Sequence, residues 1–212
     1  KMTVSSNFGN IFSLLFASIF LPFLPMAPVH LIVLNLVYDL SCIALPFDNV
    51  DSEFLKRPHI WSASSITRFM AWIGPISSVF DVLTYLVLYF IVVPMLIGGS
   101  YQAGSEQAGA FITLFQTGWF IESMWTQTMV IYMLRSPKLP FVQSRPALSV
   151  IVTTMVAALF VTSLPYSLFA SVLKMAPLNG TYFLFLFLII VLYMVSVTFI
   201  KYLYIKRYKE WL

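Results

Sequence analysis

Asn35 and Asp39 are the two side chains of this sequence whose types and spacing most clearly suit chemistry. They lie four residues apart in the apolar stretch LNLVYDL, a spacing that puts both on one face of a helix. An amide oxygen and a carboxylate together suit a hard cation such as Mg²⁺ or Ca²⁺. Asn7 and Asn10 repeat the arrangement at a spacing of three, so two neighbouring helices could each present an oxygen-rich face. The alternative is that these amides hydrogen-bond between helices and bind no ion.

Two further carboxylates, those of Asp81 and Glu122, also fall within apolar stretches and are secondary candidates for a cation site. An acidic group at the centre of a bilayer costs about 2.5–3.5 kcal/mol on insertion scales, so such groups are functional candidates by default. Asp81 could instead be paired with a residue on another helix, and Glu122 could lie nearer the outer interface. Neither belongs to a nucleophile–base arrangement, and we identify no catalytic residue. His30 and His59 lack the spacing of metal ligands.

The elements that must position these residues are helices that cross a membrane. Sixty per cent of the residues are hydrophobic and only 9% are charged, whereas a soluble domain carries about 25% charged residues. The apolar stretches reach the length of about 20 residues that a helix needs to cross a bilayer. The net charge is +4, but the basic residues sit at the ends of apolar stretches, which indicates a role in orientation and no binding of nucleic acid. We therefore expect an all-α, polytopic protein whose partner is the lipid bilayer.

Six transmembrane spans are predicted, separated by prolines and polar loops. Pro22, Pro25 and Pro28 break the chain after the first span, because proline lacks a backbone donor and clashes with the preceding turn. Pro46 stops the second span. The predicted spans are residues 5–24, 29–45, 66–97, 110–134, 147–169 and 181–204.

The basic residues predict the orientation of these spans. An even number of spans puts both chain ends on one side, and every Lys and Arg except Lys174 falls beside that side. The positive-inside rule then places both termini in the cytoplasm. The opening segment, KMTVSSNFGN, lacks the layout of a signal peptide and reads like a helix entered part-way, so we expect a piece of a longer protein.

Long motifs of the sequence resemble the magnesium-transporting P-type ATPases of bacteria. The resemblance is carried by SSNFGNIFSLLFASIFLPFLPMAPVHLIVLNLVYDL and ALPFDNVD, and by the later segments RFMAWIGPISSVFDVLTY, FQTGWFIESMWTQTMVIYMLR and KRY. It covers essentially the whole chain and is more specific than SSN with a downstream N-L-V-x-D, which indicates only the wider cation-pump superfamily. The resemblance implies that the six spans are helices five to ten of a ten-helix pump in the bacterial inner membrane.

The same resemblance implies roles for particular residues. Asn7, Asn35 and Asp39 occupy positions that are cation ligands in related calcium pumps. Those pumps carry a glutamate where this chain has Asn10 and a threonine where it has Tyr38, which argues against a calcium site of the same make-up. Fewer carboxylates suit an ion that keeps part of its water, as Mg²⁺ tends to. Asn10 and Tyr38 are therefore secondary candidates beside the three principal positions.

The family's energy-coupling parts are not in this sequence. The DKTGT motif, whose aspartate is phosphorylated, is absent, as are the nucleotide-binding and actuator domains and the fourth helix. The implied function is part of an ATP-driven magnesium importer, with Mg²⁺ as the transported ion and with ATP and Mg²⁺ used by the missing cytoplasmic domains. Those domains and the remaining helices are the implied partners. The alternatives are the same pump class carrying Ca²⁺ or another divalent cation, or a non-catalytic membrane scaffold. The loop with Asp48, Asp51 and Glu53 could contact the phosphorylation domain or simply be solvated.

Overall fold

The chain forms long helices joined by short loops. A computed structural model describes residues 2–49, 51 and 63–208, and the side chains of all of these except 2–7 and 63. Within these residues the chain contains no β-strand, and the elements in chain order are α1 (Met2–Phe20), α2 (Pro28–Cys42), α3 (Ala63–Val87), α4 (Val93–Ile97), α5 (Ala108–Leu134), α6 (Leu148–Ser163) and α7 (Gly180–Tyr208). Since α4 continues α3, the arrangement amounts to six rods.

Prolines set three of the helix ends. Helix α1 stops at Phe20, before residue 24 where the first span was expected to end, because Pro22 cannot continue the backbone ladder. Helix α2 begins at Pro28. Proline is suited to the first helical position, because an N–H there would have no acceptor within the helix. Helix α6 stops at Ser163 and passes into a 3₁₀ turn that contains Pro165, although the fifth span was expected to run to residue 169.

Helices α3 and α4 form a single long rod with a local widening. A π-helical turn at Leu88–Val92 joins them, just ahead of Pro94. Proline has no N–H to donate to the preceding turn, so a loosened turn at this place accommodates it without breaking the rod. The rod ends at Gly98, whose φ of +80° is the left-handed conformation that closes many helices.

Helices α1 and α3 approach each other closely at a pair of glycines. A Cβ atom on Gly9 would lie 3.0 Å from the Ser77 Cβ and 3.3 Å from the Gly74 carbonyl oxygen. Small residues allow the backbones of membrane helices to come this near. The approach brings Ser13, one turn further along α1, next to the middle of α3.

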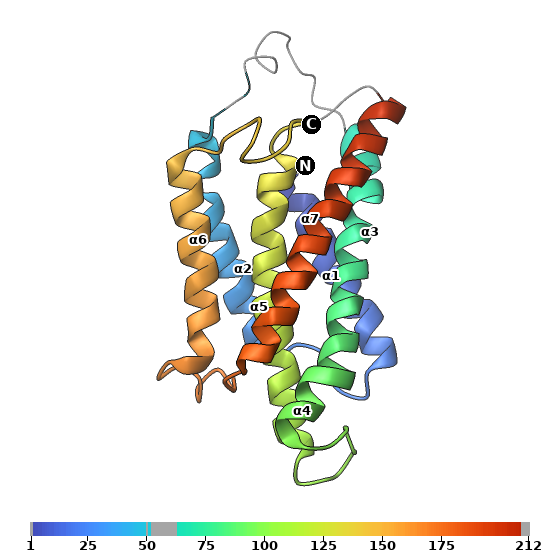
Figure 1. The fold of residues 1–212 in the computed structure, drawn as a ribbon, viewed down its shortest axis with the longest axis vertical. Coiled ribbons are helices and arrows are strands. Elements are labelled where there is room, and N and C mark those ends of the chain that lie inside the picture. Colours follow the sequence, from blue (N-terminus) through green and yellow to red (C-terminus); the bar gives the residue numbers. More distant parts are fainter. Residues whose placement is uncertain (1, 50, 52–62, 209–212) are drawn as a thin grey trace.

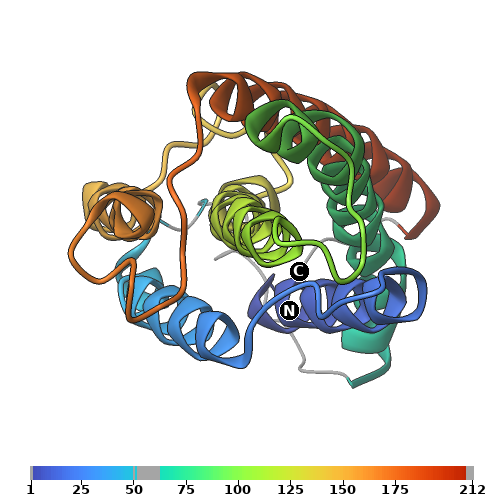
Figure 2. The same ribbon diagram turned by 90° about the horizontal axis from the view of Figure 1, so that it is seen from below.

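Helix α5 is the centre of the molecule, and the other rods form a ring around it (Figure 2). Between Thr117 and Leu134 every side chain is buried except Trp125 and Met129, which are half-buried. This part of the helix therefore has no face directed outward, and its polar side chains are enclosed by neighbouring helices.

Among the described residues, four helical segments are long and apolar enough to cross a membrane: Pro28–Phe47, Ser64–Ile97, Leu148–Tyr166 and Gly180–Tyr208. The apolar part of α1 for which side chains are described, Phe8–Phe20, is shorter. Helix α5 is long, but Gln116, Glu122 and Gln127 lower its mean hydropathy. The six predicted spans therefore correspond to six rods, of which four have the length and composition of a membrane span.

The polar loops lie at the two ends of the helix bundle. The start of α1, the end of α2, the α5–α6 loop and the end of α7 lie together at one end of the bundle (Figure 1). The α6–α7 loop, with Lys174, lies at the opposite end. This arrangement matches the separation of basic residues on which the predicted orientation rests.

Candidate cation site

A cavity of about 270 Å³ lies between α1, α2 and α5. Its polar lining comes from Asn10 on α1, Asn35 and Asp39 on α2, and Ser123 on α5. The remaining wall is apolar: Ile11, Leu14, Met26, Leu31, Leu34 and Trp119. Three helices thus bring oxygen-bearing side chains to one cavity.

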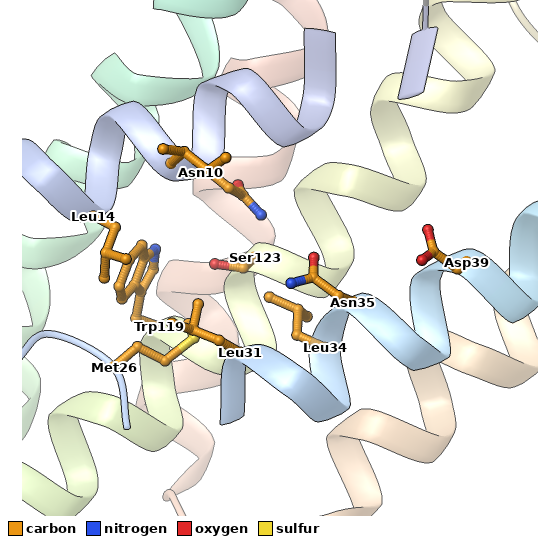
Figure 3. A pocket seen from close by; sticks show the side chains of 10 residues that line it. Asn10, Leu14, Met26, Leu31, Leu34, Asn35, Asp39, Trp119 and Ser123 are labelled. Carbon is orange, nitrogen blue, oxygen red and sulfur yellow. The ribbon is translucent and has the colours of Figure 1, made fainter. Parts of the chain in front are cut away.

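The polar side chains around this cavity are mostly neutral (Figure 3). The amide groups of Asn10 and Asn35 are directed into the space between α1 and α2, Ser123 on α5 lies between them in this view, and Asp39 lies one turn further along α2. Asp39 and Asn35 share a helix face, as their spacing of four predicts. Both are exposed, so the cavity opens beside α2. In the described part of the chain no group of three or more His, Cys, Asp or Glu side chains could hold a metal.

The structure places the other predicted residues differently. Tyr38 is fully buried in the apolar core and does not line the cavity. The side chain of Asn7 lies outside the described residues. Sequence reasoning did not identify Ser123 or Trp119. The only available signal was their spacing of four on α5, which puts them on one face without showing where that face is directed.

Ser123 stands out within the cavity lining because its hydroxyl is unsatisfied. The side chain is fully buried, and its Oγ has no hydrogen-bond partner among the described residues. A buried polar group without a partner costs about 1–3 kcal/mol, so such groups call for an explanation. This hydroxyl lies in the cavity wall but is covered, so an ion or a water would reach it only if neighbouring side chains moved.

Asp81 and Glu122 form a separate buried pair behind the cavity wall. Asp81, on α3, accepts hydrogen bonds from Ser13 Oγ at 2.5 Å and from Trp119 Nε1 at 3.0 Å. Glu122 is fully buried beside the Asp81 carboxyl. Neither Glu122 oxygen has a hydrogen-bond partner of normal geometry among the described residues. Neither acid lines the cavity, and Glu122 does not lie at an interface with water.

The loop acids at the cytoplasmic end of the predicted topology bind the α5–α6 loop. Asp48 accepts from Arg135 Nε at 2.6 Å and from the backbone N–H of Ala147 at 2.7 Å. Asp51 accepts from the hydroxyls of Ser136 and Ser144. These contacts show that neither acid is simply solvated. Glu53 lies outside the described residues.

The pKa of Asp51 reflects these contacts. Partial burial opposes ionisation, but the two serine hydroxyls and the charges of Lys138 and Arg135 outweigh it and hold the pKa of this carboxyl below its ordinary value of 3.8. Asp51 is therefore a carboxylate at neutral pH.

Lys201 joins α7 to the same end of the bundle. Its ammonium group is buried and donates to the carbonyls of Met133, Ser136 and Lys138 at 2.9, 3.0 and 2.9 Å. Met133 lies in the last turn of α5, where carbonyls have no partner within the helix. A positive charge at this place also complements the helix dipole.

Comparison with known proteins identifies the family to which the chain is related. Residues 23–203 match the family described as cation transporting ATPase, C-terminus. The magnesium-transporting ATPase, P-type 1, of Salmonella typhimurium strain LT2 is 43% identical over 211 residues, which is 100% of this chain and 22% of that protein. The protein of the same description from Escherichia coli strain K12 is 41% identical over 208 residues, or 98% of this chain and 22% of that protein.

The chain thus spans about a fifth of the length of these relatives. The resemblance of its motifs to bacterial magnesium-transporting P-type ATPases is confirmed by the identity along the whole chain. Because the family match covers more than half of the residues, the chain belongs to the family of cation-transporting ATPase C-terminal regions.

Proposed function

We propose that this chain is the membrane region, helices five to ten, of an ATP-driven pump that imports Mg²⁺ into the bacterial cytoplasm. The observation that carries the proposal is the cavity between α1, α2 and α5, where Asn10, Asn35, Asp39 and Ser123 meet. Relatives 41–43% identical to the chain are described as magnesium-transporting. ATP hydrolysis belongs to cytoplasmic domains of the whole pump, which would form an aspartyl-phosphate there.

The composition of the cavity favours a hydrated ion. Mg²⁺ requires near-octahedral geometry, gives up its water reluctantly and usually keeps several waters while one or two carboxylates bind it. Asp39 is the single acid in the lining, and the amides of Asn10 and Asn35 offer neutral oxygens. We assign Asp39 and Asn35 as principal ligands, direct or through water, and Asn7 as a third ligand on the basis of its position in the motif SSN.

The exposed side of the cavity fits a larger assembly. Asn35 and Asp39 lie on an outward side of α2 within an apolar helix. Polar groups at this depth face protein or water, because lipid offers them no hydrogen bonds. Further helices of the whole pump would cover this side and complete the site.

The test is growth of a magnesium-transport-deficient bacterium on low magnesium, with the full pump that contains this region. The wild type is expected to rescue growth, and Asp39→Asn to fail although it is expressed and inserted equally. Glu106→Gln is the matched control, since it removes an exposed acid from the α4–α5 loop.

Each other outcome is informative. Rescue by Asp39→Asn would remove Asp39 from the essential site. No rescue by a well-expressed wild type would favour another cation, and competition of Ca²⁺ or another divalent cation for uptake would identify it. A natural protein without the phosphorylation motif and cytoplasmic domains would favour the scaffold alternative.

A further inference from the structure

Asp81 connects the two walls of the cavity without reaching the cavity itself. Its Oδ2 accepts from Ser13 on α1, and its Oδ1 accepts from the indole of Trp119 on α5. Ser13 follows Asn10, which lines the cavity, by three residues on α1. Trp119 lines the cavity directly. The Asp81 carboxyl on α3 therefore holds two parts of the cavity wall in place. One is the Trp119 side chain, and the other is helix α1, which carries the lining residue Asn10.

All three members of this contact are enclosed. Ser13 is 0% exposed, and Asp81 and Trp119 are each 1% exposed. Among the described residues Asp81 forms no ion pair with a Lys, Arg or His, and its carboxyl is held by the hydrogen bonds from Ser13 and Trp119 and by its contact with the carboxyl of Glu122. A hydrogen bond to a buried carboxyl loses more than its own energy when it is broken, because the remaining donor is left unsatisfied.

We infer that Asp81 is a positioning residue for cation binding, which orients Trp119 and aligns α1 with α5 while never touching the ion. This inference rests on the proposed function, because it concerns the cavity assigned to Mg²⁺. It assigns to Asp81 a role different from that of a secondary ligand. The affinity for the ion then depends on the hydrogen bonds that the Asp81 side chain makes with Ser13 and Trp119, and not on the charge of Asp81.

An amide at this position separates the two roles. In Asp81→Asn the amide oxygen can accept from Trp119, and the amide N–H can donate to Ser13. The Ser13 hydroxyl can then direct its own proton to the Gly9 carbonyl, which lies 2.8 Å away. The network closes again without a charge. In Asp81→Leu the side chain has a similar size, but both contacts are lost.

The experiment measures the KM and Vmax of magnesium uptake by the full pump in proteoliposomes. Asp81→Asn is expected to keep a KM within about twofold of the wild type, whereas Asp81→Leu raises it roughly tenfold, as the loss of about one hydrogen bond would. Trp119→Phe removes the indole N–H and keeps an aromatic ring. It should raise KM as well, and adding Asp81→Leu to it should raise KM by less than in the wild type.

Thr84→Val is the matched control. It removes the hydroxyl of a residue of α3 that is 1% exposed, and among the described residues this hydroxyl bonds the Phe80 carbonyl of its own helix and no other group. Its KM is expected to equal that of the wild type. If removing any buried polar group from α3 weakened binding, this variant would also show a raised KM. Equal defects in Asp81→Asn and Asp81→Leu would overturn the inference, because the charge would then be required. A lower Vmax with unchanged KM in Asp81→Leu would overturn it too.

The two proposals fail in different ways. A wild-type pump that takes up no magnesium would contradict the proposed function. A wild-type pump that transports magnesium, but whose two Asp81 variants behave alike, would contradict the positioning role alone.

Discussion

Single carboxyl groups in this protein have different roles because of what surrounds them. Asp39 is exposed beside a cavity, Asp81 is held by two donors, and Glu122 is buried against the carboxyl of Asp81. All three were recognisable in the sequence as acids in apolar stretches. Their separation into a site and a buried pair depends on contacts such as Ser13 with Asp81, 68 residues apart, which no local pattern contains.

Asp51 offers a prediction about pH. Its pKa in the folded protein lies below the ordinary value of 3.8, so its contacts stabilise the fold fully above that pH and progressively less as the pH falls through the folded pKa. Asp51→Asn is therefore expected to lower the melting temperature at neutral pH, and by less in acid. Thermal unfolding of both proteins in detergent, measured from about pH 7 down to about pH 3, tests this.

Glu106→Gln serves as the control, since this acid is exposed in a loop. A difference between wild type and Asp51→Asn that stays constant across the whole range would show that the Asp51 carboxylate gains nothing from its two serine partners.

At the scale of elements, helix positions follow from the sequence, whereas helix rotations do not. Runs of apolar residues and prolines predict the rods and most of their ends. The rotation of α5 about its axis was not predictable, because residues on all its sides are buried and no polar face marks the outside. For that reason Trp119 and Ser123 were missed, although Asn35 and Asp39 were correctly placed on one face.

The crossing of α1 and α3 gives a prediction with an internal control. A Cβ on Gly9 would press on the Gly74 carbonyl at 3.3 Å and on the Ser77 Cβ at 3.0 Å, both close to the backbone of α3. A Cβ on Gly74 would meet only the ring of Phe8, at 2.9 Å, and that side chain is 42% exposed and can turn away. Gly9→Ala should therefore lower the melting temperature more than Gly74→Ala does. Equal effects, or the reverse order, in thermal unfolding would show that the backbones are not in close approach.

At the scale of the whole molecule, one end of the bundle is tied together by polar contacts between loops. Asp48 and Asp51 join the end of α2 to the α5–α6 loop, and Lys201 joins α7 to it. The sequence located these charges at one end, but their mutual contacts depend on the packing of helices that are distant in the chain.

Substitution of Lys201 measures how much the contacts at this end of the bundle stabilise the folded protein. Lys201→Met keeps the apolar stem but leaves three carbonyl groups without their donor, and hydrogen bonds to a charged group contribute about 1.5–3 kcal/mol each. We expect a loss of at least about 2 kcal/mol in the free energy of unfolding. Lys206→Met, on an exposed part of the same helix, should change it little. Similar stabilities for the two variants in denaturant titrations would rule out an anchoring role for Lys201.

The central place of α5 has a mechanical consequence. A rod enclosed on all sides cannot turn or slide unless every neighbour moves with it, because packed interiors deform little. Helices α1 and α2 are different, since their outer sides carry exposed apolar residues and meet no other part of the described chain. A shift of α1 or α2 would therefore change the width of the cavity between these helices and α5, while the part of the wall formed by Trp119 and Ser123 stays in place.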